Sequence, residues 1–185
     1  MPSRDRRDFT TAMASRRKPD DPDPSDSPSA LPYRPCVGLL LFNAERRVLI
    51  GQRTDSDRDA WQMPQGGIDP GETPRQAAMR ELLEEVGTDK AAIVAEMGAW
   101  LTYDLPEDLR ARLWHGRYRG QAQKWFALRF LGEDADINIA TETPEFRAWR
   151  WSPLDEMIDL AVPFKRDVYA RVIGEFAPLL ARLRD

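Results

Sequence analysis

Apolar residues along the chain fall into short runs that predict β-strands. Residues 36–42 form a nearly continuous apolar run, which is typical of a strand buried on both faces. The polar residues 43–46 follow, and residues 48–52 have the composition of a second strand, so the two segments are expected to form a hairpin. Three later segments also predict strands: residues 96–103, 124–131 and 147–151.

A helical period replaces this pattern after residue 73. One apolar stripe recurs at i, i+3, i+4 and i+7 and is expected to face the core: Met79, Leu82, Leu83 and Val86. Thr73 is a good N-cap, Pro74 suits the first helical position, and Gln76 completes a capping box. Gly87 is placed to end the helix as a C-cap glycine.

The other segments differ in how well they suit regular structure. Residues 66–71 contain three glycines and a proline, and we expect them to form a loop that no regular element would tolerate. A short helix is predicted over residues 154–160 and a longer one over residues 165–176. Pro178 is expected either to end the longer helix or to kink it, because proline lacks the N–H group and clashes with the preceding turn.

The first 32 residues are expected to be a disordered tail. A basic block around Arg16, Arg17 and Lys18 is followed by a run of proline, aspartate and serine. Such a mixture buries too little apolar area to offset the entropy of ordering. We therefore expect one folded domain over residues 33–185, which is long enough for a single core.

Composition narrows the class of protein. Hydrophobic residues make up 42% of the chain, and no run approaches the roughly 18 apolar residues of a membrane span. The basic N-terminal block is followed by no apolar segment, so it is not read as a secretory signal. A single cysteine, Cys36, excludes an internal disulfide and suits a reducing compartment. We expect a cytoplasmic protein without a membrane association, and no stable protein partner is predicted.

Charge is unevenly distributed. The net charge is −4, which does not indicate a general nucleic-acid binder, but residues 106–130 carry six basic side chains against two acidic ones. An acidic protein with one basic stretch can attract a polyanion to one face. The alternative is a solvated loop with scattered arginines.

Carboxylates gather on one face of the predicted helix at residues 74–86. Glu81, Glu84 and Glu85 fall within about 100° of one another on a helical wheel, opposite the apolar stripe. Like charges at these spacings repel, and a bound cation would turn the repulsion into ligation. Oxygen ligands favour a hard cation such as Mg²⁺, with Mn²⁺ or another divalent cation as a substitute. A purely solvated acidic face is the alternative.

The glycines in front of this helix favour ligand binding over that alternative. Gly66, Gly67 and Gly71 allow the backbone to approach a ligand closely and allow positive φ. A glycine-rich loop that leads into a helix N-terminus can present N–H groups to phosphate. Glu72 adds a fourth carboxylate at the end of the loop.

Together these residues resemble the Nudix box, GX5EX7REUXEEXGU. The fixed positions are matched by Gly66, Glu72, Arg80, Glu81, Leu82, Glu84, Glu85 and Gly87; only the final aliphatic site departs, with Thr88. The resemblance implies an α/β Nudix fold, a mixed sheet sandwiched between helices, and metal-dependent hydrolysis of a pyrophosphate. It further implies that Glu81 and Glu85 are the primary metal ligands and Glu84 a ligand or base. Arg80 orients these glutamates, and Glu72 supports them.

Outside the box, the chain resembles the group of bacterial RNA 5′-pyrophosphohydrolases and dinucleoside polyphosphate hydrolases. The matching segments are residues 33–35, 61–67, 100–103, 121–126, 143–146, 149–151 and 164–169. The loop over residues 54–59 looks slightly longer than in the enterobacterial enzymes. This resemblance implies that Arg34 and Lys124 contact phosphates, with Gln123 beside them, and that Glu145 contributes to metal binding or water activation.

The same resemblance implies a site for the base. Arg53 and Phe164 would sandwich a purine, although Phe164 could instead be a hydrophobic staple for the last helix. The other implied substrate contacts are Gly66, Gly67, Tyr103 and Lys165, with Gly66 also among the metal ligands. No site role is assigned to His115, the only histidine, or to Cys36.

The resemblance therefore implies an RNA pyrophosphohydrolase that converts a 5′-triphosphate end to a monophosphate. A diadenosine polyphosphate hydrolase is the first alternative, since one site can accept both substrates. A catalytically idle Nudix domain that binds RNA or protein is disfavoured because all four box carboxylates are present. An enzyme that removes oxidised dGTP is disfavoured by the matches outside the box.

Overall fold

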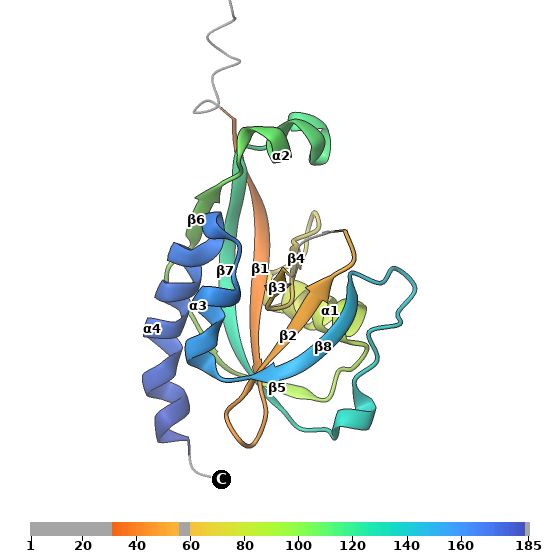
Figure 1. The fold of residues 1–185 in the computed structure, drawn as a ribbon, viewed down its shortest axis with the longest axis vertical. Helices are drawn as coiled ribbons and strands as arrows, with labels where there is room; N and C mark the ends of the chain where they lie inside the picture. The colour runs from red at the N-terminus through yellow and green to blue at the C-terminus, as the bar shows by residue number, and fades with distance from the viewer. Residues whose placement is uncertain (1–30, 56–59, 184–185) are drawn as a thin grey trace, which may run out of the picture.

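The computed structural model describes residues 31–55 and 60–183, through which a mixed eight-stranded sheet runs (Figure 1). At its centre β1 (Tyr33–Phe42) and β7 (Gly120–Phe130) are parallel and pair along ten residues of β1. Such parallel strands are buried on both faces, which accounts for the continuous apolar run in β1. The tail predicted for residues 1–32 falls almost wholly outside the described residues.

Shorter strands extend this central pair on both sides. Strands β5 (Ala91–Glu96) and β6 (Leu101–Asp104) pair antiparallel with β7, and β4 (Gln65–Gly67) pairs antiparallel with β1. On the other side, β2 (Val48–Arg53) pairs antiparallel with both β3 (Trp61–Gln62) and β8 (Phe146–Ser152).

The predicted hairpin is present only at its turn. The register of β1 and β2 contains one pair, Phe42↔Val48, after which the strands diverge (Figure 1). Nearer the middle of β1, away from the turn, the amide of Leu39 donates to the carbonyl of Pro64 at 2.9 Å and not to β2. The divergence leaves the strand ends apart, and the segment around β4 lies against β1 where β2 would otherwise continue.

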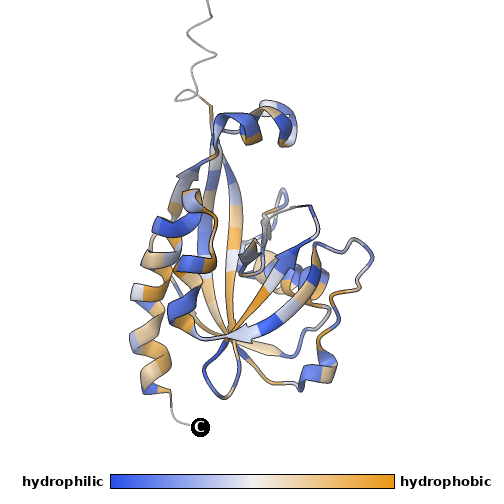
Figure 2. Ribbon diagram, in the orientation of Figure 1, coloured by the Kyte–Doolittle hydropathy of each residue, from blue (hydrophilic) through white to orange (hydrophobic). Residues whose placement is uncertain are grey.

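Helices cover both faces of the sheet. Helix α1 (Pro74–Val86) packs against one face, and α4 (Arg166–Arg182) with α3 (Met157–Leu160) covers the other (Figure 1). Two separate apolar cores result, because successive residues of a strand point to opposite faces: Leu39 and Leu41 pack toward α1, and Leu40 and Phe42 toward α4. Figure 2 shows the hydrophobic residues concentrated along β1 between these helices. The predicted α/β/α sandwich is confirmed.

The remaining helical segments are short. They are α2 (Glu107–Arg112) and the 3₁₀ turns η3 (Trp114–Gly116), η4 (Asp134–Asp136), η5 (Leu154–Glu156) and η6 (Pro163–Lys165). Segment α2–η3 lies at the end of the sheet where β1 begins (Figure 1). No helix among the described residues is long and apolar enough to cross a membrane.

Helix α1 confirms its predicted ends but not the whole of its predicted stripe. Thr73 and Gln76 form the capping box, and Gly87 adopts a left-handed φ of 73°. Leu82 and Val86 are fully buried, whereas Leu83 is 52% exposed. The buried stripe is rotated toward the alanines at positions 77 and 78, because their small side chains let the helix approach the sheet closely.

Other boundaries also differ from the predictions. The single strand expected over residues 96–103 is divided: β5 ends at residue 96, and β6 begins at residue 101. The sequence pattern did not predict the short helix α2. Gly66 and Gly67 lie in strand β4 rather than in a loop, since their backbone pairs with β1. Helix α4 begins one residue later than expected and continues through Pro178 to Arg182.

Candidate active site

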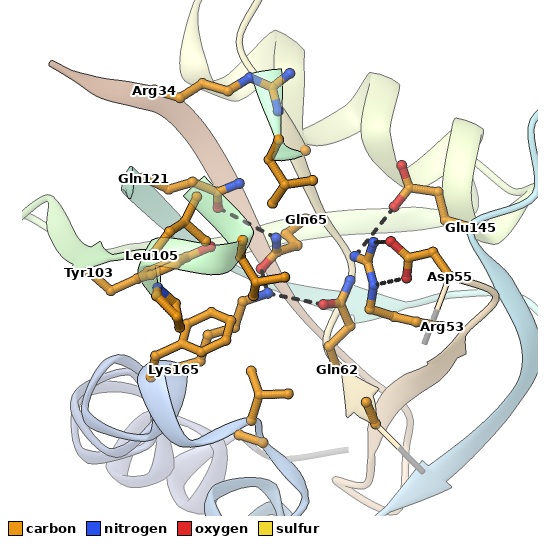
Figure 3. A pocket seen from close by; sticks show the side chains of 18 of the residues that line it. Arg34, Arg53, Asp55, Gln62, Gln65, Tyr103, Leu105, Gln121, Glu145 and Lys165 are labelled. Atoms are coloured by element: carbon orange, nitrogen blue, oxygen red, sulfur yellow. Dashed lines mark hydrogen bonds and ion pairs between the residues drawn. The ribbon is translucent and has the colours of Figure 1, made fainter. Parts of the chain in front are cut away.

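A pocket of about 870 Å³ opens between α1, the α2–η3 segment and η6 (Figure 3). Residues far apart in the chain line it, and most of the predicted site is among them: Arg34, Arg53, Gly66, Gly67, Glu81, Glu84, Tyr103, Glu145, Phe164 and Lys165. The structure thus brings together side chains from the beginning, middle and end of the domain.

The two glycines of β4 each make room for a different side chain. A Cβ atom at Gly66 would lie 1.8 Å from Cδ of Glu81, and one at Gly67 would lie 2.2 Å from a terminal nitrogen of Arg34. Consecutive strand residues point to opposite faces, so the pair opens β4 to a carboxylate on one face and a guanidinium on the other. Close approach rather than positive φ accounts for Gly66 and Gly67, because of the three glycines at positions 66, 67 and 71 only Gly71 has a left-handed φ, at 85°.

Arg80 holds the acidic face of α1 together. Its guanidinium donates to Glu72 at 2.9 Å, Glu81 at 2.8 Å and Glu84 at 3.0 Å. It also donates to the carbonyl oxygen of Gly67 at 2.7 Å, which ties the helix to β4. Glu72 has a pKa lowered chiefly by its hydrogen bond from Arg80. One cation therefore contacts three carboxylates, those of Glu72, Glu81 and Glu84.

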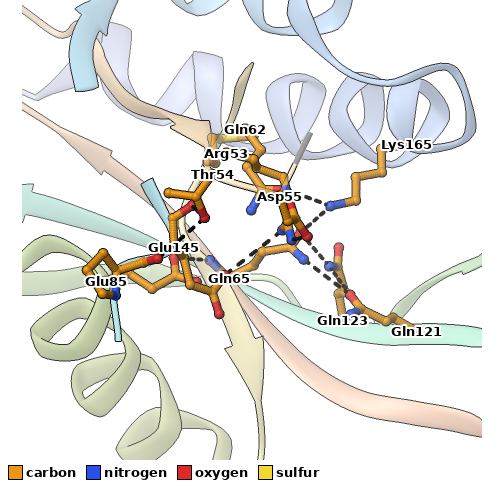
Figure 4. Close-up of polar contacts among 12 residues, drawn as sticks. Arg53, Thr54, Asp55, Gln62, Gln65, Glu85, Gln121, Gln123, Glu145 and Lys165 are labelled. Atoms are coloured by element: carbon orange, nitrogen blue, oxygen red, sulfur yellow. Dashed lines mark hydrogen bonds and ion pairs between the residues drawn. The ribbon is translucent and has the colours of Figure 1, made fainter. Parts of the chain in front are cut away.

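Glu85 is the exception on this face, because none of the ion pairs found in the described part of the chain involves it. Although the helical wheel places Glu85 opposite the apolar stripe, its side chain is 3% exposed and lies under β4. One oxygen, Oε2, accepts the amide of Gln65 at 3.0 Å, whereas Oε1 is buried without a hydrogen-bond partner among the described residues. Burial, and next the neighbouring Glu145, raise the pKa of Glu85 well above its usual value (Figure 4).

The carboxylates fit a divalent cation in chemistry. Burial also raises the pKa of Glu81, even though Arg80 contacts it, so two buried carboxylates lack full compensation. Hard oxygen donors of this kind suit Mg²⁺ or Mn²⁺. Within the described part of the chain, no three acidic, histidine or cysteine side chains are already arranged to hold a metal ion. Arg80 instead holds Glu81 and Glu84, and the unpartnered oxygen of Glu85 remains available as a ligand.

A polar network forms the floor of the pocket. Lys165 donates to Oε1 of both Gln62 and Gln65 at 3.0 Å, and Gln65 is linked in turn to Gln121 and Gln123 (Figures 3 and 4). Burial, and next the charge of Arg53, lower the pKa of Lys165 to about 7. The sequence alone indicates no role for Gln62, Gln65 or Gln121. The alternation of Gln121 and Gln123 on one strand was the available signal.

The residues predicted to hold a base line the pocket, but both have other contacts. The Phe164 and Tyr103 rings are 5.6 Å apart, and Phe164 also packs against the core beneath α4. Arg53 forms a two-point ion pair with Asp55, with one bond of 2.6 Å, and lies 3.9 Å from Glu145. Its guanidinium is thus engaged by carboxylates rather than free to face a ring.

Two predicted substrate contacts do not reach the pocket. The ammonium group of Lys124 donates to the carbonyl of Gly98 at 3.1 Å and lies 3.3 Å from Glu96. Gln123 is completely buried and receives a hydrogen bond from the indole of Trp125. Neither residue lines the pocket, because strand alternation turns Lys124 toward α1 and packing covers Gln123.

We expect Glu85→Gln to stabilise the metal-free protein at neutral pH. The raised pKa means that Glu85 contributes stability below its unfolded value of about 4.3, and this stability is lost as the pH rises through the folded-state pKa. Glutamine keeps the acceptor for Gln65 and removes the buried charge. Thermal unfolding in EDTA should show a Tm gain of several degrees at pH 8 that shrinks at pH 5, since about 1 kcal/mol corresponds to roughly 2–4 °C.

Glu84→Gln is the matched control, because Glu84 is exposed and contacts Arg80. The difference in Tm between Glu84→Gln and the wild type should be small at both pH values. Added Mg²⁺ should raise the Tm of the wild type more than that of Glu85→Gln. A Tm for Glu85→Gln in EDTA at pH 8 that is equal to or lower than the wild-type Tm would contradict the uncompensated charge.

Sequence comparisons agree with this geometry. The NUDIX domain profile matches residues 32–172. The chain is 57% identical over 156 residues to the RNA pyrophosphohydrolase of Rhodospirillum rubrum, covering 84% of this chain and 94% of that protein. It is 59% identical to the protein of the same name from Roseobacter denitrificans, covering 79% and 92%, and 53% identical to that from Rickettsia rickettsii, covering 81% and 93%.

Solved structures match at the level of the fold. The E. coli dihydroneopterin triphosphate pyrophosphohydrolase superposes with a TM-score of 0.59 at 24% identity, covering 78% of this chain and 99% of that chain. A C. elegans Ap4A hydrolase complex superposes with a TM-score of 0.57 at 21% identity, covering 78% and 98%. The box residues, the sandwich and the profile match coincide in one domain, and the chain belongs to the Nudix family.

Proposed function

We propose that this protein is an RNA pyrophosphohydrolase that removes pyrophosphate from the 5′-triphosphate end of RNA. The observation that carries the proposal is its 53–59% identity, over nearly the full length of the relatives, to proteins named RNA pyrophosphohydrolase. An RNA substrate would place the enzyme in the cytoplasm. In the reaction, water attacks phosphorus, the α–β phosphoanhydride bond breaks, and a 5′-monophosphate and pyrophosphate remain.

Mg²⁺ would be held by Glu81, Glu84, Glu85 and Glu145, with the backbone of Gly66 beside them. Bound there, it would neutralise charge on the phosphates and lower the pKa of water. Arg80 would keep the glutamates oriented through the hydrogen bonds described above. Of these four glutamates, Glu84 and Glu145 have the more exposed side chains, at 57% and 46%, and are suited to accept the proton that water loses.

The phosphate chain would be bound by the cationic groups that line the pocket. Arg34 is half-buried in the wall, and Lys165 lies at the floor with its ammonium group on two glutamine oxygens. A polyanion near Lys165 would favour its protonated form, because an opposite charge offsets the effect of burial. Positioning and charge neutralisation of this kind account for most of the catalysis in phosphoryl transfer.

The nucleobase would stack on Phe164, whose ring lies beside Tyr103. Stacking on an aromatic ring tolerates any base, as a site for varied RNA ends requires. For Arg53 to cover the second face of the base, its ion pair with Asp55 would have to open. A diadenosine polyphosphate presents the same groups, a base and a phosphate chain, and is the substrate against which RNA has to be compared.

Turnover of a triphosphorylated oligonucleotide and of diadenosine tetraphosphate tests the proposal. With Mg²⁺ present, kcat/KM should be higher for the oligonucleotide, and pyrophosphate should be released. Glu85→Gln should reduce turnover of the oligonucleotide at least about 100-fold, which corresponds to about 2.7 kcal/mol of transition-state stabilisation. A higher kcat/KM for diadenosine tetraphosphate would overturn the RNA assignment and leave the hydrolase in place.

Salt dependence separates Arg34 from Lys124. Because Arg34 lines the pocket and Lys124 does not, Arg34→Gln should reduce the slope of log kcat/KM against log salt by about 1, as expected for one lost phosphate contact. Lys124→Gln should leave that slope unchanged and lower the Tm, since it removes the bonds to Gly98 and Glu96. Equal loss of slope in both variants would return Lys124 to the substrate site.

Phe164→Ala distinguishes stacking from packing. If a base stacks on Phe164, removal of the ring should lower kcat/KM by an amount that corresponds to about 1–3 kcal/mol. The loss should affect both substrates if any purine is held, and RNA alone if a downstream nucleotide is held. If Phe164 is only a staple for α4, the Tm falls while the ratio of kcat/KM for the two substrates stays at the wild-type value.

A further inference from the structure

The turn η3 after helix α2 places a large aromatic side chain on an unfavourable backbone. Trp114 and His115 have φ angles of 49° and 57°, and Gly116 follows with 70°. A left-handed conformation is readily adopted by glycine but is a costly outlier for a bulky residue. Such strain persists only where the surrounding structure enforces it, and it concentrates at ligand-binding sites. Trp114 is the bulkiest side chain of this strained turn.

The indole forms part of the pocket wall and contacts one cation there. The guanidinium carbon of Arg34 lies 5.0 Å from the centroid of the Trp114 ring, within the range of a cation–π interaction. The indole also forms a T-shaped pair with the ring of Tyr118, with ring centroids 6.0 Å apart. Both Arg34 and Trp114 line the pocket. The α2–η3 segment therefore holds an aromatic surface against the arginine of β1.

Arg34 differs from the other arginines of the site in how it is held. Arg53 is paired with Asp55, and Arg80 is paired with Glu72, Glu81 and Glu84. None of the ion pairs found among the described residues involves Arg34. Its guanidinium lies between the Trp114 ring and the backbone of Gly67, where the missing side chain leaves room for it. An aromatic face fixes a guanidinium without neutralising its charge, whereas a carboxylate would compete with phosphate for the same N–H groups.

We propose that Trp114 is a positioning residue: it holds the Arg34 guanidinium, with its charge intact, in the orientation that meets the phosphate chain of the substrate. The inference rests on the proposed function only in requiring a polyphosphate ligand, whichever nucleoside carries it. It also explains the strained turn, because the indole reaches Arg34 from that backbone conformation.

Two substitutions at one site test the role of the aromatic face. Trp114→Phe keeps a ring, and Trp114→Leu keeps apolar bulk without one. The probe is an ATP analogue with a methylene bridge between the α and β phosphates, whose Kd is measured by calorimetry with Mg²⁺. We expect Trp114→Leu to raise Kd about 3- to 30-fold, the range of a cation–π interaction, and Trp114→Phe to raise it less than about threefold. Equal Kd values for the two variants would overturn the proposal.

A double-mutant cycle with Arg34→Gln distinguishes positioning from direct contact. If Trp114 acts through Arg34, Trp114→Leu should change Kd less than about twofold once Arg34 is absent. If Trp114 stacks on the base itself, the loss should be the same in both backgrounds, and the positioning role is rejected. An unchanged Kd for Trp114→Leu in the wild-type background also rejects it.

Controls separate this result from misfolding and from a wrong substrate. Trp100→Ala removes a tryptophan that is 44% exposed and does not line the pocket, and it should leave Kd unchanged. Circular dichroism and Tm of each variant show whether it folds; if Trp114→Leu does not, Trp114→Met, which also keeps apolar bulk without a ring, takes its place in the cycle. The same cycle is run on kcat/KM for triphosphorylated RNA and diadenosine tetraphosphate. Poor turnover of RNA would then count against the proposed function and leave the positioning of Arg34 tested by Kd.

Discussion

Repulsion between buried carboxylates is the constraint around which the site is built. The side chains of Glu81 and Glu85 are buried where α1 packs against β4, and Glu145 approaches Glu85 from the segment before β8. Carboxylates close together in a poorly solvated site raise each other's pKa unless a cation intervenes. Arg80 compensates only the side of the cluster that includes Glu81. The uncompensated oxygen of Glu85 makes a divalent cation the natural complement of this face.

The positive charge that the pocket presents depends on the different surroundings of its cations. Arg53 is paired with a carboxylate, Arg34 lies against an aromatic ring, and Lys165 is buried on glutamine oxygens with its pKa lowered to about 7. Each arrangement leaves a different amount of positive charge available to a polyphosphate. The glycines of β4 let Arg34 and the carboxylate of Glu81 approach this strand closely, each at a different glycine.

Signals that depend on neighbouring residues were readable from the sequence. The capping box and the C-cap glycine of α1 are satisfied within one turn of the helix, so their residue types alone determined where it begins and ends. The spacing of the acidic residues likewise placed three carboxylates on adjacent positions of the helix. The apolar run of β1 indicated a buried strand, and the combination of motifs indicated the family.

Tertiary packing decided which of these groups are buried and which reach the ligand. The sequence could not show that Glu85 lies under β4, that Lys124 faces α1, or that Trp114 lies against Arg34, since each depends on a strand or turn distant in the chain. Helical periodicity identifies a face but not the direction from which the sheet approaches it, so Leu83 was wrongly placed in the core. Residue types and local spacing determined the helix and its chemistry; burial and orientation arose only from long-range contacts, because desolvation is a property of the packed structure.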